Sequence, residues 1–147
     1  MVNYKEVISY MNEYFKSYSV IDVKGKTVLD IGADIGTSAF YFLSKGATNV
    51  IAFSMEPQEI FDNRIEWHNQ WKGDYIEADI LKIDCEGCEC LLYHEFIEKY
   101  QEWYIAIHTF SNCFFPMKKY LESHGTLVFI TPDKREYLYC KSLNTIK

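Results

Sequence analysis

The chain has 147 residues and a formal net charge of −6, and 48% of its residues are hydrophobic and 17% aromatic. This composition indicates one folded domain over residues 1–147 and argues against disorder, while the acidic balance gives no general electrostatic reason to expect nucleic acid or an anionic membrane as partner. No apolar run reaches membrane-spanning length and the first residues resemble no secretory signal, so we expect a cytoplasmic protein.

The first part of the chain alternates helical and strand-like patterns. An amphipathic run predicts a helix over 3–17, and short β-branched, apolar runs predict buried strands over 27–31 and 49–53. The helix-compatible segment 37–45 lies between these two strands. Two parallel strands joined by one helix form a right-handed βαβ unit.

The rest of the chain continues this alternation and ends in a hairpin. The expected elements are a helix over 57–71, a strand over 79–84, a helix over 88–100, a strand over 103–108, a helix over 116–124, and strands over 126–130 and 136–140. Pro57 suits the first position of its helix, and the five-residue connection 131–135 makes the last two strands an antiparallel hairpin. We therefore expect an α/β fold with a doubly wound, Rossmann-like sheet that is mostly parallel, with a C-terminal antiparallel hairpin.

A glycine turn follows the strand over 27–31. Gly32 permits a tight turn and Gly36 permits close packing where the next helix begins, an arrangement that brings backbone N–H groups close to a ligand. Asp30, near the end of the strand, would point an acceptor into the crevice above the sheet. The same glycine spacing also occurs in ordinary strand-to-helix turns.

Ligands of doubly wound sheets bind beyond the carboxyl ends of the strands. The polar residues that the sequence places there are Asp30, Ser54, Glu56, Asp84, Glu86 and His108. A histidine at a strand end can equally be a hydrogen-bonded scaffold residue.

The five cysteines are an odd number, which is not typical of a secreted disulfide framework. Cys85, Cys88 and Cys90 form a cluster, and the spacing of the first two can hold zinc. A structural zinc site usually needs a second, separated pair of ligands. Cys113 is the only cysteine far enough from the cluster to belong to such a pair. We expect the clustered cysteines to pack as small side chains around a strand end and to hold no metal.

Three motifs occur in order: Val-Leu-Asp-Ile-Gly-Ala-Asp-Ile-Gly at 28–36, Ile-Ala-Phe at 51–53 and Leu-Lys-Ile-Asp-Cys-Glu-Gly at 81–87. Together they resemble the class I S-adenosylmethionine-dependent methyltransferases, and within that superfamily the FkbM-like group. The resemblance covers residues 26–130 and implies a methyltransferase sheet with S-adenosylmethionine as cofactor.

The resemblance implies a cofactor site around the glycine turn. Its residues at the methionine end of the cofactor would be Asp30, Gly32, Ala33, Asp34 and Gly36. The acid that binds the ribose hydroxyls should follow Phe53, but Ser54 stands there and Glu56 comes two residues later. Either a bulge brings Glu56 to the ribose or the contact is lost, and each charge-assisted hydrogen bond is worth roughly 1.5–3 kcal/mol.

The chain is shorter than the family pattern between the second and fourth strands. We therefore expect the third strand of the sheet to be missing or vestigial, which would leave the second strand near an edge and favour a homodimer or a covering helix. The adenine would be poorly enclosed unless Tyr75, Asp79 or a partner chain supplies a wall.

The resemblance implies methyl transfer, which we expect to be O-methylation with a carboxylate as general base. Asp84 and Glu86 are the first candidates for that base and His108 is the third, although Asp84 could instead cap a helix and Glu86 could be a solvated loop acid. We predict that Asp84 matters more to turnover than His108. These three residues could also converge on a divalent cation, which their spacing does not require, and we assign no metal.

Two alternatives stay open. One is a degenerate, non-catalytic module of the same fold, favoured by Ser54 and the shortened middle and opposed by the intact glycine turn. The other is an RNA methyltransferase, against which the acidic chain argues. Among partners, we expect no membrane and no nucleic acid. A small molecule or sugar is a candidate acceptor, and lipid and protein acceptors stay open too.

Overall fold

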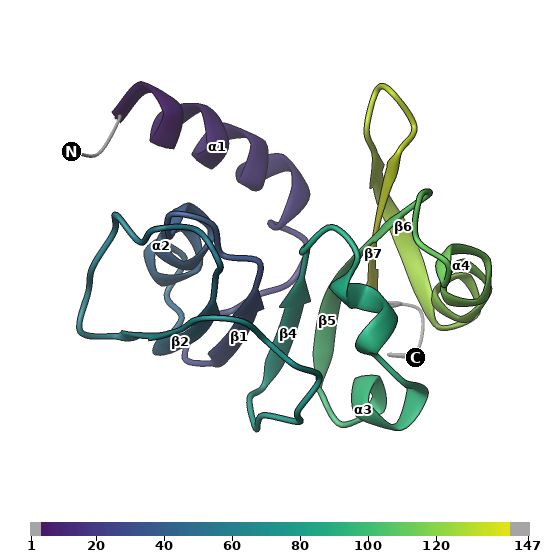
Figure 1. The fold of residues 1–147 in the computed structure, drawn as a ribbon. Coiled ribbons are helices and arrows are strands. Elements are labelled where there is room, and N and C mark those ends of the chain that lie inside the picture. Colours follow the sequence, from purple (N-terminus) through teal and green to yellow (C-terminus); the bar gives the residue numbers. More distant parts are fainter. Residues whose placement is uncertain (1–3, 142–147) are drawn as a thin grey trace.

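The computed structural model describes residues 4–141, apart from several side chains of the first helix. It contains one seven-stranded sheet with the strand order β3-β2-β1-β4-β5-β7-β6 (Figure 1). The strands are β1 (Thr27–Ile31), β2 (Asn49–Phe53), β3 (Ile65–His68), β4 (Ile80–Ile83), β5 (Glu102–His108), β6 (Gly125–Ile130) and β7 (Glu136–Lys141). β7 runs antiparallel to both of its neighbours, and the other pairings are parallel. The expected α/β sheet with an antiparallel C-terminal hairpin is confirmed.

Helices cover both faces of the sheet. They are α1 (Tyr4–Ser17), α2 (Thr37–Ser44), the 3₁₀ helix η1 (Cys88–Leu91), α3 (His94–Glu98) and α4 (Phe114–His124). α2 packs on one face with the residues that follow α1, and α3 and α4 pack on the other. The predicted start of the first helix at Asn3 lies outside the described residues. None of the helices within 4–141 is long and apolar enough to cross a bilayer.

The parallel strands are buried on both faces, which explains their near-continuous apolar sequences. Val28 and Ile80 belong to the core under α2, and their neighbours Leu29 and Leu81 belong to the core under α3 and α4. A sheet buried on both sides has no polar face, so its strands lack the alternation of a half-exposed strand.

The third strand was expected to be missing or vestigial, and it is present as a short strand of four residues. The segment expected as a helix over 57–71 instead contains an irregular stretch and β3, which pairs in parallel with β2 from Val50↔Ile65 to Phe53↔His68. Ile65 is buried while Glu66 is exposed. This alternation is the pattern of a half-buried edge strand, and it outweighs the helix-start signal of Pro57. β2 is therefore an interior strand, which removes the argument for a homodimer through its edge.

The helix predicted over 88–100 is also broken. It forms η1 and α3, separated by Leu92 and Tyr93 in extended conformation. The break places Phe96 and Ile97 in the core. The helix before the hairpin begins at Phe114 rather than at Pro116.

Candidate cofactor and acceptor cleft

A cleft of about 710 Å³ opens beyond the carboxyl ends of β1, β2 and β4. Its walls come from the glycine turn, from the segments after β2 and β3, from the loop after β4 and from the first residue of β7. This size falls within the range of small-molecule and cofactor sites, and the place is the one that open parallel sheets use for ligands.

The glycine turn holds the two central strands close together. Gly32 has a φ of +87°, and a Cβ there would collide with the backbone carbonyl of Asp84. The N–H groups of Gly32 and Ala33 both donate to the carbonyl oxygen of Phe53 at 3.0 Å. Gly36, at φ +114°, packs against Ile60 and Trp67. Of the predicted turn residues, Gly32 and Asp34 line the cleft, whereas Ala33 and Gly36 are buried behind it.

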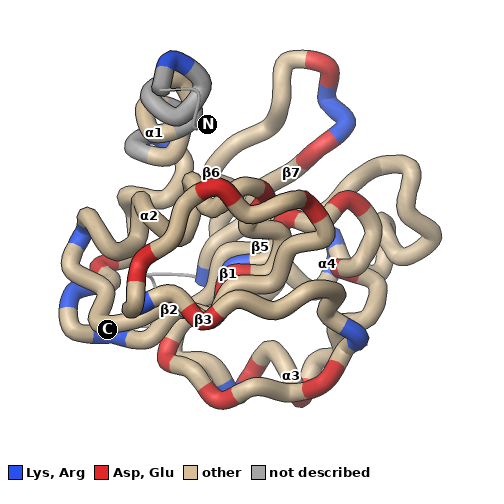
Figure 2. Tube along the Cα trace, turned by 60° about the vertical axis from the view of Figure 1, so that its left-hand side comes forward, with Lys and Arg blue, Asp and Glu red and all other residues tan. Residues whose placement is uncertain are grey.

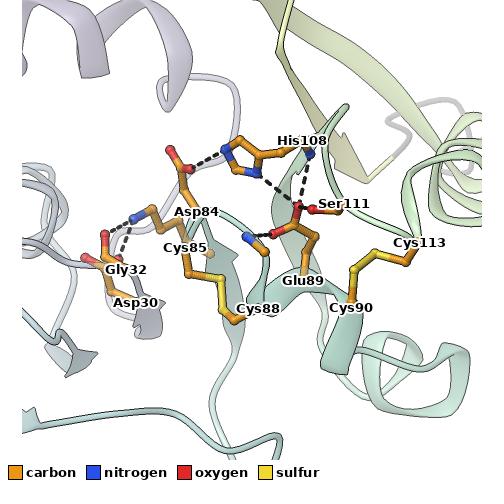
Figure 3. Close-up of a disulfide and its surroundings, with 12 residues drawn as sticks. Asp30, Gly32, Asp84, Cys85, Cys88, Glu89, Cys90, His108, Ser111 and Cys113 are labelled. Carbon is orange, nitrogen blue, oxygen red and sulfur yellow. Dashed lines mark hydrogen bonds and ion pairs between the residues drawn. A yellow bond between two sulfur atoms is a disulfide. The ribbon is translucent and has the colours of Figure 1, made fainter.

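Asp30 does not reach the cleft, so the prediction that it points an acceptor into the crevice is wrong. Its side chain is fully buried and forms an ion pair with Lys82 on the neighbouring strand, Oδ1 to Nζ at 2.8 Å (Figure 3). Ser38 Oγ donates to its other oxygen at 2.6 Å, and Lys82 Nζ donates to Gly32 O at 2.9 Å. Burial lowers the pKa of Lys82, but the Asp30 carboxylate, together with Asp84 and Asp34, outweighs that effect and raises it above its usual value. This pair joins β1 to β4 beneath the glycine turn.

Ser54 is committed to the turn after β2. Its hydroxyl donates to Asp34 O at 2.7 Å and accepts from the Glu56 N–H at 3.0 Å. The side chain is buried, while Glu56 is exposed and lines the cleft. Of the two candidates for the ribose acid, Glu56 therefore has its carboxylate at the cleft, and Ser54 links that residue to the glycine turn.

Asp84, His108 and Glu136 meet at the carboxyl ends of β4 and β5 and the start of β7. His108 Nε2 lies 2.8 Å from Glu136 Oε1 and 3.6 Å from Asp84 Oδ1. Each residue brings one potential ligand atom, all within 4.8 Å of one another. Asp84 and Glu136 line the cleft, whereas His108 is buried behind them. Glu86 also lines the cleft. The acid that joins Asp84 and His108, however, is Glu136 and not Glu86.

Glu89 holds the histidine from the other side. This fully buried carboxylate accepts from His108 Nδ1 and from the His108 backbone N–H, both at 3.0 Å (Figure 3). It also accepts from Gly87 N at 2.7 Å and from Ser111 Oγ at 3.1 Å. Burial raises the pKa of Glu89, but its hydrogen bonds, led by that from His108, outweigh burial and lower it.

These contacts set the protonation states of the group. Burial lowers the pKa of His108, but the hydrogen bonds to Glu136 and Glu89 outweigh it and raise that pKa to about 10. His108 is thus an imidazolium at neutral pH, donating from both nitrogens. Burial and the adjacent Glu136 carboxylate raise the pKa of Asp84 to about 7, although Lys82 and His108 oppose the shift. Asp84 therefore gains and loses its proton near neutrality.

The sequence alone did not identify Glu89 and Glu136. Glu136 follows Asp84 by more than fifty positions, and only the insertion of β7 beside β5, with His108 opposite Glu136 in the register, brings them together. In the sequence, Glu89 follows a turn and has the pattern of a solvent-exposed acid. Its burial depends on four donors that come from two separate segments.

Four of the five cysteines form disulfides, Cys85–Cys88 and Cys90–Cys113, so the expectation that the clustered cysteines pack only as small side chains around a strand end is wrong. The first disulfide closes the loop after β4, and the second ties η1 to the residue before α4 (Figure 3). Cysteines in disulfides offer no thiolate to zinc. The absence of a structural metal stays a prediction, which elemental analysis of the purified protein tests.

A second cavity of about 440 Å³ lies near the opposite end of the strands. Trp103, Tyr120 and Gly125 line it, beside the beginning of β5. Asp84 and His108 are not among its lining residues. The cleft beyond β1 and β4 is thus the one that six of the predicted site residues line: Gly32, Asp34, Ser54, Glu56, Asp84 and Glu86.

Solved structures similar to this one include methyltransferases. Fibrillarin from Aeropyrum pernix, with bound S-adenosyl-L-methionine, matches with a TM-score of 0.60 and 14% identity over 90% of this chain and 74% of that one. Magnesium protoporphyrin IX methyltransferase from Synechocystis PCC 6803, also with the cofactor bound, matches with a TM-score of 0.57 and 11% identity over 92% and 77%. A Plasmodium falciparum protein assigned as a ribosomal RNA methyltransferase matches with a TM-score of 0.62 and 16% identity over 94% of both chains. The chain therefore shares its fold with these methyltransferases.

Closer relatives are viral proteins. No protein-family model matches the chain. It is 40% identical over 146 residues to Uncharacterized protein 158B of Sulfolobus islandicus rod-shaped virus 1, covering 90% of this chain and 91% of that protein. It is 36% identical over 145 residues to Uncharacterized protein 65 of Sulfolobus islandicus filamentous virus (isolate Iceland/Hveragerdi), covering 90% of each. The chain therefore belongs to the same family as protein 158B and protein 65 of these two viruses.

Proposed function

We propose that the chain is a methyltransferase that binds S-adenosylmethionine in the cleft beyond β1, β2 and β4. The observation that carries this proposal is the glycine turn of β1, placed at the cleft of a sheet whose fold is shared with solved methyltransferases. Within the superfamily, the sequence motifs keep the FkbM-like group as the expected closest type.

The residues that line the cleft fit this cofactor. Gly32 and Asp34 would hold its methionine end, and Glu56 would accept hydrogen bonds from the ribose hydroxyls. Tyr75 and Asp79, two of the residues considered as a possible adenine wall, lie elsewhere: Tyr75 packs on Phe96, and Asp79 accepts from the Thr27 N–H. Asn69, Gln70 and Trp71, which follow β3 and line the cleft, would form that wall instead.

The cofactor supplies an electrophilic methyl group, so the protein must position the acceptor and take its proton. Asp84 suits the second task because it faces the cleft and its pKa of about 7 lets it accept a proton near neutrality. His108 does not, because both of its nitrogens already donate to carboxylates. We keep O-methylation with Asp84 as the general base as the proposed reaction, with Glu86 as the nearest other carboxylate on that loop.

Calorimetric titration with S-adenosylmethionine and with its demethylated product tests the proposal. We expect saturable 1:1 binding of both, and weaker binding by the Glu56→Gln variant, which loses charge-assisted hydrogen bonds worth about 1.5–3 kcal/mol each. Glu59→Gln is the matched control, because Glu59 is also an exposed acid of that loop but lies outside the cleft lining. The absence of heat at millimolar ligand would exclude the catalytic function.

A non-catalytic binding module of the same fold is the second candidate. It is favoured by the occupation of the ribose-acid position by Ser54, whose hydroxyl is used within the protein. Cofactor binding without methyl transfer to any acceptor in a panel would support this candidate over the enzyme.

A further inference from the structure

We propose that the Cys85–Cys88 disulfide is a reversible redox site of the cofactor cleft, which an uncharged dithiol opens and whose opening weakens cofactor binding. The disulfide closes a ring of four residues, Cys-Glu-Gly-Cys, in the loop after β4 (Figure 3). The effect on the cofactor rests on the proposed function, whereas the reduction itself does not.

A reductant can reach this disulfide from the cleft. Cys85 and Cys88 are both partly exposed, and both line the cleft. The other disulfide, Cys90–Cys113, lies outside that lining. Thiol–disulfide exchange requires access, because a thiolate must attack one of the two sulfur atoms. A small thiol that enters the cleft can therefore approach the first disulfide.

The backbone inside the ring favours its opening. Glu86 has a φ of +51°, in the left-handed region, and Gly87 has a φ of +124°. A non-glycine residue adopts the left-handed region at a cost, and the surrounding structure must hold it there. Reduction would let Glu86 leave this conformation. No residue from 91 to 112 has a positive φ, so release of backbone strain favours reduction of the first disulfide and not of the second.

Hydrogen bonding holds the cysteines of the second disulfide together. Glu89, next to Cys90, accepts from Ser111 Oγ at 3.1 Å, and Ser111 lies two residues before Cys113. This contact keeps the two thiols near each other when their bond is open, which raises their effective concentration and lets the bond re-form. We therefore expect a reductant to open Cys85–Cys88 first.

The ring is in contact with the glycine turn of the cofactor site. A Cβ on Gly32 would lie 3.3 Å from the Cα of Cys85. At the other end of the ring, the Gly87 N–H donates to the buried carboxylate of Glu89 at 2.7 Å. All five residues from 84 to 88 line the cleft. Opening the ring would let this wall sample other conformations, and apparent affinity falls with the fraction of molecules that keep the binding conformation.

The exchange balances with a dithiol as the only reactant. One thiolate of the reductant attacks a sulfur atom of the bond, which forms a mixed disulfide and releases the other protein sulfur as a thiolate. The second thiolate of the reductant then displaces the remaining protein sulfur and closes its own disulfide. Cys85 and Cys88 together gain two electrons and two protons, and the reductant loses the same number of each.

The charge of the cleft selects an uncharged reductant. Asp84 and Glu86 flank Cys85, and no lysine, arginine or histidine lines the cleft among the described residues. Lys134 and Arg135 lie on the β6–β7 turn, where they are exposed and outside that lining (Figure 2). Walls with charge of one sign disfavour ligands of the same sign. An uncharged dithiol therefore enters more readily than an anionic thiol.

Labelling after reduction tests the redox site. The full chain is treated with increasing dithiothreitol and then with iodoacetamide, and peptide mass spectrometry assigns the labelled cysteines. We expect half-reduction of Cys85–Cys88 at a dithiothreitol concentration at least about tenfold below that for Cys90–Cys113, since left-handed strain corresponds to about that factor. The uncharged 2-mercaptoethanol should react with Cys85–Cys88 faster than the anionic 2-mercaptoethanesulfonate.

Two substitutions of Glu86 form a matched pair for the role of strain. Asparagine adopts the left-handed region more readily than glutamine, and both side chains are uncharged amides. Glu86→Gln should keep the easy reduction, whereas Glu86→Asn should require about two- to fivefold more dithiothreitol. Equal values for the two variants would show that strain at this residue does not favour opening.

Calorimetric titration with S-adenosylhomocysteine tests the effect on the cleft. We expect the selectively reduced wild type to bind at least about fivefold more weakly than the oxidised protein, and re-oxidation to restore the affinity. The double variant Cys85→Ser, Cys88→Ser should bind like the reduced protein and should not respond to dithiothreitol. The control is Cys90→Ser, Cys113→Ser, which keeps the ring and should retain the response. The redox cycle of the wild type needs no substitution.

Several results would overturn the inference. Reduction of both disulfides at the same dithiothreitol concentration would do so, as would equal or tighter cofactor binding by the reduced protein. Loss of the circular dichroism of the folded state on selective reduction would show that the bond is purely structural. Equal rates with the two monothiols would exclude selection by charge. Failure of S-adenosylhomocysteine to bind either form is a separate result, which refutes the proposed function, while selective labelling would still establish the redox site.

Discussion

At the scale of single residues, the ion pair between Asp30 and Lys82 is the buried connection between the two central strands. We predict that Lys82→Met lowers the free energy of unfolding by about 3–5 kcal/mol, because it leaves a buried carboxylate without its cation. Lys26→Met is the control, since Lys26 pairs with Glu102 at 3.7 Å in a partly exposed position and should cost no more than about 1 kcal/mol. Denaturant unfolding measures both values, and equal losses would contradict the assigned role of the buried pair.

The protonation state of His108 is a second property of a single residue that can be tested. Its pKa of about 10 in the folded protein exceeds the ordinary value of 6.5. The imidazolium therefore contributes its full stabilisation below pH 6.5, and that contribution is lost as the pH rises through 10. We predict that the His108 ring signals titrate near pH 10 in an NMR pH series, and that Glu89→Gln moves the midpoint downward. A midpoint near 6.5 in the wild type would show that the two carboxylates do not hold the proton.

Asp84 and His108 should differ in their effect on turnover. Once an acceptor is known, Asp84→Asn should lower the rate by about 10²–10⁴, the typical effect of losing a general base. His108→Ala should act more on acceptor affinity, because the imidazolium positions Glu136 and is not free to accept a proton. In the wild type, turnover should rise as the pH passes through about 7, where the Asp84–Glu136 pair loses its shared proton. Loss of turnover in the histidine variant alone would reverse the assignment.

At the scale of elements, the two disulfides fasten the loops that carry the site. Cys90–Cys113 closes a segment with a sequence separation of 23, whereas Cys85–Cys88 closes one of 3. Loop-closure entropy grows with the length of the closed segment. We predict that Cys113→Ser lowers the unfolding free energy by about 2–4 kcal/mol and that Cys88→Ser lowers it by less.

Denaturant unfolding under non-reducing conditions tests this order of stability. Mass spectrometry of the intact chain, with and without a reductant, confirms that each variant lacks the intended bond. The disulfides also remove one argument for a cytoplasmic location. Such bonds are typical of oxidising compartments but occur in intracellular proteins of some hyperthermophiles, so the location stays a prediction.

The elements that the sequence predicted correctly are those with strong local patterns. The strands over 27–31 and 49–53 match the structure at both ends, because buried β-branched runs bounded by polar residues leave little ambiguity. The helix predicted over 57–71 was wrong because Pro57 is a strong local signal for a helix start, whereas β3 is short and depends on its pairing with β2. Strand formation is decided by such non-local contacts more than by intrinsic preference.

At the scale of the whole molecule, the alternation of strands and helices was enough to predict the fold class. The site was predictable in part. Asp84, Glu86, Ser54 and Glu56 were found because strand ends share one edge of a parallel sheet. Glu136 was not, because its place beside His108 depends on the antiparallel insertion of β7 between β5 and β6. The cysteine pairing likewise depends on tertiary distances that spacing alone does not give.

We expect the methyl donor to bind in the cleft beyond β1, β2 and β4. The most direct test is NMR mapping of backbone amide shifts during titration with S-adenosylhomocysteine. We predict saturable shifts at Gly32, Asp34, Glu56 and Gln70, which line the cleft, and none at Trp103 and Tyr120, which line the cavity near the other end of the strands. Shifts confined to Trp103 and Tyr120, or no shifts at millimolar ligand, would exclude this cleft as the cofactor site.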